Sequence, residues 1–120
     1  MVIDMHKNSK DQFNEEREKL NEIVMKYSGK NIKRFYGLDM SVYRDGALPK
    51  KTKELIGLVS SLVLKCEDCV KFHLNQCYEL EVSSEEIEEA LAIGLLIGGS
   101  IIIPELRKTF KYWDELVKGE

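Results

Sequence analysis

The chain is organised around the stretch Lys65-Cys66-Glu67-Asp68-Cys69-Val70-Lys71-Phe72-His73. It contains two of the three cysteines and one of the two histidines. Two thiols three residues apart, followed four residues later by an imidazole, form a compact set of titratable groups. No other segment has comparable chemical content, so the other segments are interpreted as the scaffold that positions this one.

The composition predicts a single domain over residues 1–120 with a modest core. Hydrophobic residues make up 43% and charged residues 32% of the chain, which argues against a disordered protein. A net charge of −3 without a basic cluster argues against a nucleic-acid partner. The uncharged run 90–103 is shorter than the about 20 residues of a membrane-spanning helix, so no membrane partner is expected.

The cysteine content points to redox or metal chemistry rather than to a structural staple. Residues 1–7 lack an apolar core of signal-peptide length, so a cytoplasmic location is expected. Thiols are normally kept reduced in that compartment, and three cysteines is an odd number for a disulfide framework. A Cys-x-x-Cys motif in that setting is typical of redox or metal sites.

Apolar periodicity and helix-capping signals predict an all-α fold of six helices joined by short turns. Two capping boxes mark helix starts, Ser9 with Gln12 and Ser83 with Glu86. A strand is disfavoured because only residues 101–103 look β-like. The expected helices run from about Ser9 to Tyr27, from Ile32 to Tyr43, from Pro49 to a break near Lys65, from there to about Leu80, from Ser83 to Gly99, and from Pro104 through Val117.

The break before the central stretch is an inference, because no glycine or proline separates Leu58 from Val82. Either one helix continues through this region, or it ends and a new helix begins near Cys66. Glu67 and Asp68 are acidic residues suited to a first helical turn, where they meet the positive end of the helix dipole. We therefore favour two helices.

The two cysteines of the central stretch form a candidate redox pair. On one helix Cys66 and Cys69 are surface neighbours, within reach of a disulfide after local adjustment. A thiolate at a helix N-terminus is favoured by the dipole, and reversible dithiol–disulfide chemistry suits this arrangement. Exposure at the helix start favours Cys66 as the attacking thiol, whereas proximity to His73 favours Cys69.

A thiol pair also needs a proton acceptor. His73 lies one turn beyond Cys69 on the same helix, and histidine is the side chain most suited to proton transfer near neutral pH. A third group usually orients such a base, and Glu54, twelve residues before Cys66 at the edge of an apolar helix face, is the candidate.

Less specific interpretations remain open for each of these residues. The cysteines can be buried helix residues, and Glu54 can pair with Lys50 or Lys51. A zinc site of Cys66, Cys69, His73 and Cys77 is disfavoured, because Cys69 and Cys77 lie about 12 Å apart along a helix. Cys77 is interpreted as a core residue and His6 as part of the N-terminal segment, and no metal or cofactor is expected.

The combination of Lys53-Glu54-Leu55-Ile56 with Cys66-x-x-Cys69-x-x-x-His73 resembles the AhpD-like branch of the carboxymuconolactone decarboxylase family. The likeness extends upstream to Gly46-Ala47-Leu48-Pro49 and downstream to Ser83-Ser84-Glu85-Glu86-Ile87. It covers roughly residues 30–117, with a core motif at 46–103 preceded by an N-terminal helix within 1–29.

The resemblance implies an all-helical fold that assembles into trimers or hexamers. It implies an antioxidant thiol–disulfide or peroxide-reducing activity, for which a dithiol or protein donor supplies the electrons. By this likeness Glu54, Cys66, Cys69 and His73 occupy catalytic positions, with the glutamate, the histidine and water relaying protons to the cysteine pair. The uncharged run 90–103 independently predicts an interface with another subunit.

One residue departs from the family's pattern. The best-known members with this motif have a histidine just before the second cysteine, where this chain has Asp68. A second hypothesis is therefore a non-catalytic oligomeric binding or redox-sensing protein of the same fold. A third, decarboxylation or related chemistry on a small organic acid, rests on the family name alone.

Overall fold

The computed structural model describes residues 7–120, so His6 and most of the segment used to judge a signal peptide lie outside the described residues. The fold is all-α, as predicted, and the described part of the chain contains no strand. None of its helices is long and apolar enough to cross a membrane. The elements are α1 (Ser9–Tyr27), α2 (Lys30–Val42), α3 (Lys50–Val63), α4 (Glu67–Glu79), α5 (Ser84–Gly98), the 3-10 turn η1 (Ser100–Ile102) and α6 (Ile103–Lys118).

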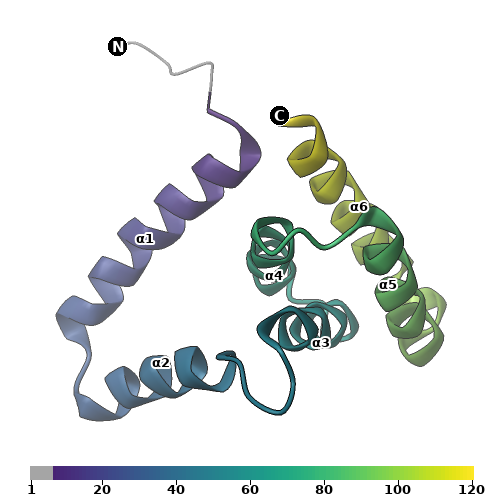
Figure 1. Ribbon diagram of the computed structural model, residues 1–120. Helices are drawn as coiled ribbons and strands as arrows, with labels where there is room; N and C mark the ends of the chain where they lie inside the picture. Colours follow the sequence, from purple (N-terminus) through teal and green to yellow (C-terminus); the bar gives the residue numbers. More distant parts are fainter. Residues whose placement is uncertain (1–6) are drawn as a thin grey trace.

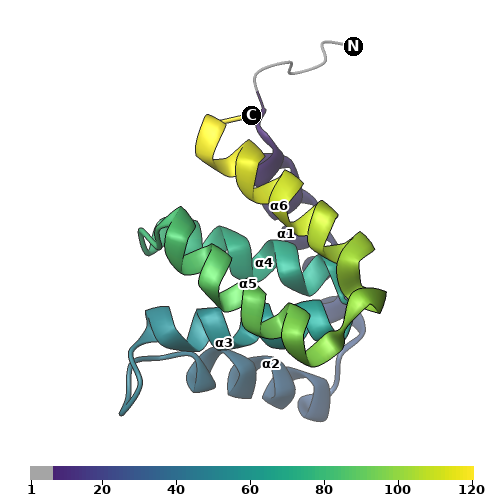
Figure 2. The ribbon, with the colours of Figure 1, turned by 90° about the vertical axis from the view of Figure 1, so that its right-hand side faces the viewer.

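Helices α3 to α6 form the packed body of the molecule. In Figure 1 α3 and α4 lie at the centre with α5 and α6 along one side, and Figure 2 shows the same four helices layered against one another. Helix α3 packs on both α4 and α5, and α4 also packs on α6. The core is almost entirely aliphatic, with two aromatic residues from α6, and comprises Leu58, Leu62, Val70, Leu74, Cys77, Val82, Ile87, Leu91, Ile102, Tyr112, Trp113 and Leu116.

Helices α1 and α2 form an arm around this body. Figure 1 shows them as the two sides of an open angle, with α1 starting beside the C-terminal end of α6 and α2 returning towards α3. Neither helix has a buried residue, although both carry large apolar side chains. The arm therefore presents an apolar surface that this chain alone does not cover.

The predicted break between α3 and α4 is confirmed. Lys65 adopts a left-handed conformation with φ of 59°, and the N–H of Cys66 donates to the carbonyl of Ser61 at 3.0 Å. This geometry reverses the chain without glycine, so that α4 folds back against α3. Glu67 and Asp68 then lie in the first turn of α4.

Two of the helix starts differ in detail from the prediction. The capping box of Ser83 with Glu86 is present at α5. At α1, by contrast, the cap is Asn8, whose side chain accepts from the N–H of Asp11, so the predicted Ser9 box is wrong. Ser9 instead donates its hydroxyl to Glu115, which ties α1 to α6. Pro49 is the cap residue of α3 rather than part of its first turn.

The connection between α2 and α3 is fixed by polar contacts. The ammonium of Lys53 donates to the carbonyls of Val42 at 2.8 Å and Arg44 at 2.7 Å, which satisfies the end of α2. The carboxylate of Asp45 accepts from the N–H of Lys50 at 2.7 Å at the start of α3. Tyr43, between these anchors, is thereby directed towards α4.

Candidate active site

Cys66 and Cys69 stand at the start of α4 and form a disulfide, with their Cα atoms 5.3 Å apart. Cys66 is the cap residue, and its sulfur accepts from the N–H of Cys69 at 3.3 Å. Cys66 is half-buried whereas Cys69 is exposed. The expectation that the helix start exposes Cys66 is therefore wrong, because the turn at Lys65 folds Cys66 back towards α3.

Glu54 and His73 meet between α3 and α4. Oε2 of Glu54 lies 2.7 Å from Nδ1 of His73, and Oε1 accepts from the ammonium of Lys50 at 3.0 Å. Glu54 is 1% exposed and His73 7%. Burying a carboxylate is costly unless it is paired, and here both of its oxygens have nitrogen partners. The geometry fixes one ring nitrogen of His73 and leaves Nε2 for other chemistry.

Nε2 of His73 faces Tyr43, a residue that the sequence analysis did not select. The tyrosine hydroxyl lies 3.5 Å from Nε2, and the two ring centroids are 5.2 Å apart. Burial raises the pKa of Tyr43 above 10.0, and the negative charges of Glu54 and Asp39 add to this effect. Tyr43 follows the last residue of α2, where helix periodicity says nothing about its partner, so no sequence signal identified it.

Gly57 provides the space in which these rings lie. A Cβ atom at this position would stand 2.6 Å from Cε1 of His73 and 2.7 Å from the Tyr43 hydroxyl, which is closer than Cβ atoms approach their neighbours in proteins. The signal for this residue was present in the sequence, since Gly57 interrupts an otherwise large apolar helix face. Glycine here permits a close approach of side chains to the α3 backbone.

A hollow of about 290 Å³ opens beside Cys69 and His73. One wall comes from α4 and the other from the arm, so the arm is part of the site. The guanidinium of Arg17 lies 4.1 Å from the ring centroid of Phe72 and forms no ion pair within the described residues. The lining residues are Arg17, Phe35, Tyr36, Asp39, Asp68, Cys69, Phe72 and His73.

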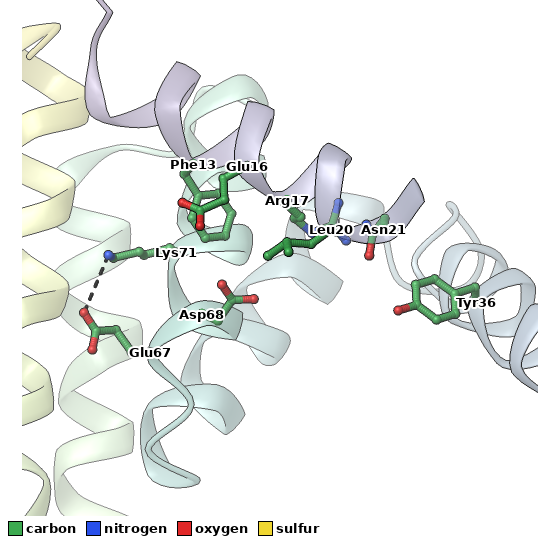
Figure 3. A pocket seen from close by; sticks show the side chains of 9 residues that line it. All are labelled: Phe13, Glu16, Arg17, Leu20, Asn21, Tyr36, Glu67, Asp68 and Lys71. Atoms are coloured by element: carbon green, nitrogen blue, oxygen red, sulfur yellow. Dashed lines mark ion pairs between the residues drawn. The ribbon is translucent and has the colours of Figure 1, made fainter. Parts of the chain in front are cut away.

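A larger hollow of about 560 Å³ between α1 and α4 continues from the first and shares Arg17, Tyr36 and Asp68 with it. Figure 3 shows Asp68 projecting from α4 into this space, while Glu67 on the same turn is paired with Lys71. The exposed carboxylate of Asp68 forms no ion pair within the described residues. Its charge opposes formation of a thiolate at the neighbouring Cys69.

Cys77 lies outside this site. It is fully buried in the core, as predicted, and burial raises the pKa of its thiol to about 12. A thiol that stays protonated at neutral pH is a poor nucleophile.

The chain is similar to several known proteins. A sequence profile of the Carboxymuconolactone decarboxylase family matches residues 30–114. A protein of Cupriavidus necator is 34% identical over 82 residues, which are 68% of this chain and 73% of that protein. A protein encoded in the cox locus of Paracoccus denitrificans is 28% identical over 82 residues, with 68% and 74% covered.

Solved structures show the same fold. A Thermotoga maritima protein is 50% identical, with a TM-score of 0.87 over 89% of this chain and 94% of that chain. In a second crystal structure, with a TM-score of 0.85, the Thermotoga protein is described as a carboxymuconolactone decarboxylase family member and a candidate participant in an antioxidative response. A Legionella pneumophila protein of that family is 26% identical, with a TM-score of 0.75 over 88% of this chain and 97% of that one.

Proposed function

The chain belongs to the carboxymuconolactone decarboxylase family, and on that premise we propose that it is a thiol–disulfide oxidoreductase of the AhpD-like kind. Its Cys66–Cys69 pair cycles between dithiol and disulfide. The observation that carries the proposal is the buried pair of Glu54 and His73, held at 2.7 Å, with His73 on the same helix as the cysteines and lining a hollow with Cys69. The antioxidative role considered for the Thermotoga relative is compatible with this chemistry.

Cys69 is the attacking thiol in this proposal, because it is exposed and shares a hollow with His73. With a peroxide, the Cys69 sulfur attacks one oxygen, the O–O bond breaks, and the alcohol leaves with one proton. Cys66 then attacks the Cys69 sulfenic acid, water leaves, and the disulfide forms. The two thiols lose two electrons and two protons, and the peroxide becomes an alcohol and water.

Glu54 and His73 manage the protons of that cycle. The carboxylate accepts from Nδ1–H, which leaves the lone pair on Nε2 to take up a proton. The negative charge of Glu54 stabilises the imidazolium that results. A dithiol or protein electron donor restores the thiols by exchange with the disulfide.

A second candidate is a redox-sensing or binding protein with little turnover. Asp68 favours it, because an unpaired carboxylate beside Cys69 lowers the fraction of reactive thiolate. Such a protein reacts slowly with a peroxide or disulfide, and its cysteine pair changes redox state without rapid turnover. No feature described in this site specifically favours decarboxylation.

We also propose that the chain acts as a homo-oligomer, a trimer or hexamer, in the cytoplasm. The apolar faces of the arm and of α5 are exposed in the single chain, with Leu96 84% and Phe35 67% accessible. Since the arm forms one wall of the hollow at Cys69, assembly supports the site as well as the fold.

The deciding experiment is turnover of a peroxide or of a small disulfide with a dithiol donor. Wild type should turn over above background, whereas Cys66→Ser and Cys69→Ser should be inactive. Glu54→Gln should lose about 100-fold in turnover, the usual worth of an oriented general base. Wild type without turnover, but oxidised stoichiometrically by peroxide, would establish the sensor instead. Activity of Glu54→Gln equal to wild type would contradict the proton relay.

A further inference from the structure

Tyr43 is placed to control the only nitrogen of His73 that is free to accept a proton. We propose that Tyr43 is a positioning residue of this site, donating its hydroxyl hydrogen to Nε2 of the neutral His73 ring and so holding the imidazole in the orientation that Glu54 also sets. The inference rests on the proposed thiol–disulfide function for its role in turnover. The interaction itself stands on the geometry of α3, α4 and the loop after α2.

The two nitrogens of His73 have different partners. Nδ1 lies 2.7 Å from the Glu54 carboxylate, which can only accept, so Nδ1 carries the hydrogen. Nε2 of the neutral ring then holds a lone pair. The Tyr43 hydroxyl at 3.5 Å is the donor that faces it. A contact of this length is a weak hydrogen bond, so it orients the ring without holding the lone pair tightly.

The loop is built to hold Tyr43 in this place. Lys53 ties the carbonyls on either side of Tyr43, those of Val42 and Arg44, to α3. Asp45 fixes the next residues by accepting from the N–H of Lys50. These three contacts attach the loop with Tyr43 to α3, the helix that carries Glu54. One helix therefore holds both partners of His73 in place.

Gly57 lies on the buried face of α3 where Tyr43 meets His73. Its missing Cβ leaves room for both the His73 ring and the Tyr43 hydroxyl, which would approach such an atom to 2.6 Å and 2.7 Å. Any larger residue would separate the two rings. Glycine at this position therefore lets the Tyr43 hydroxyl and the His73 ring meet against the buried face of α3.

The chemistry of the contact is reversible. A phenol is both donor and acceptor, so Tyr43 donates to the neutral ring and rotates to accept once Nε2 is protonated. Because burial raises its pKa, Tyr43 keeps its own proton throughout. The proton removed from the Cys69 thiol therefore resides on Nε2, not on the phenol, and leaves with the alcohol product. The other charged groups around this hollow are Asp39, Asp68 and Arg17.

The test compares Tyr43→Phe with wild type by nitrogen-15 NMR of the histidine ring. The chain has two histidines, so the His73 resonances are assigned with His73→Gln. In Tyr43→Phe the Nε2 resonance should move towards that of an imidazole nitrogen without a hydrogen bond, while Nδ1 stays bonded to Glu54. Tyr78→Phe is the matched control, because the Tyr78 hydroxyl lies outside this site and its ring packs on Trp113.

Turnover gives the second readout. Tyr43→Phe should reduce kcat about ten-fold with little change in KM, the loss expected for one hydrogen bond, and should alter the pH profile of kcat. Lys53→Met, which frees the loop without changing the tyrosine, should shift Nε2 in the same direction. Unchanged Nε2 resonances in both variants would overturn the inference. Absence of turnover in the wild type would contradict the proposed function. The NMR comparison would still show whether Tyr43 donates a hydrogen bond to His73.

Discussion

Gly57 sets the tightest constraint at the scale of single residues, since its neighbours are the rings of the site rather than core aliphatics. Gly57→Ala should displace His73 and Tyr43, because no flexible chain end can yield to the new methyl group. We expect a stability loss of about 1–3 kcal/mol, typical of an overpacked position, and a loss of turnover larger than that of Tyr43→Phe. Chemical denaturation and the peroxide assay measure the two effects.

Gly37→Ala is the matched control for that substitution. Gly37 lies in α2, and a Cβ there would meet nothing within 4 Å. Alanine is the better helix former, so this variant should gain about 0.5–1 kcal/mol and keep its turnover. Equal stability and activity in the two variants would mean that Gly57 does not form the space assigned to it.

Cys77 predicts a pH dependence of stability. Burial raises the pKa of this thiol from 9.0 to about 12, so between these values the unfolded chain has lost a proton that the folded chain retains. The contribution of Cys77 is complete below pH 9.0 and is lost as the pH rises towards 12. The slope approaches about 1.4 kcal/mol per pH unit for one proton.

Cys77→Ala isolates that contribution. Unfolding curves at pH 8 and pH 10.5 should show wild type losing more stability than the variant over this interval. Tyr112, whose pKa burial also raises to about 12, is present in both proteins and cancels from the difference. Parallel loss in the two proteins would show that the Cys77 thiol ionises in the folded state at its ordinary pKa.

At the scale of helices, the α5 cap allows a direct prediction. Ser83 accepts from the N–H of Glu86 at 3.1 Å, and the Glu86 carboxylate accepts from the N–H of Ser83 at 2.9 Å. Ser83→Ala should cost about 1 kcal/mol in urea denaturation, the usual worth of a serine cap. The pKa of Glu86 is lowered chiefly by the Ser83 N–H, so the other half of the box is lost as the pH falls through the carboxyl range.

Ser60→Ala serves as the control for that cap, because Ser60 is exposed in the last turn of α3, away from any helix N-terminus. It should change stability by less than about 0.5 kcal/mol, as surface substitutions usually do. If both alanine variants behaved alike, the hydrogen bonds of the α5 cap would contribute nothing measurable.

The sequence predicted helix starts correctly where the residues that fix the start lie within the helix or its cap. The structure confirms two such starts: that of α4, predicted from the acidic Glu67 and Asp68, and that of α5, predicted from the capping box at Ser83. The cap at Asn8 was missed because Ser9 offered an equally good pattern, and only a contact with Glu115 on α6 decides between them. Tyr43 was missed for the same kind of reason, since its partner His73 lies on another helix, thirty residues away.

Considering the molecule as a unit, α2 and the solvent-facing side of α5 both carry charges near their N-terminal ends and apolar residues beyond them, and the charges have opposite sign. The three cations of α2 all lie in its first half, whereas its apolar residues run along its whole length; α5 begins with acids and continues with apolar residues. Lys33 and Arg34 on α2, and Glu88 and Glu89 on α5, form no ion pair within the described residues. A parallel contact between α2 of one copy and α5 of the next would match charge with charge and apolar face with apolar face.

Such a contact joins different surfaces on the two copies, and a trimer or hexamer requires that its repetition about a rotation axis closes a ring. Lys33→Glu with Arg34→Glu should shift sedimentation towards smaller species and weaken turnover, because the arm lines the hollow at Cys69. Adding Glu88→Lys and Glu89→Lys should restore the assembly, since the swapped charges match again. Lys19→Glu with Arg107→Glu changes the net charge equally on other helices and should leave assembly intact. Failure of the fourfold variant to recover would rule out the pairing of α2 with α5, and a monomeric wild type would rule out assembly altogether.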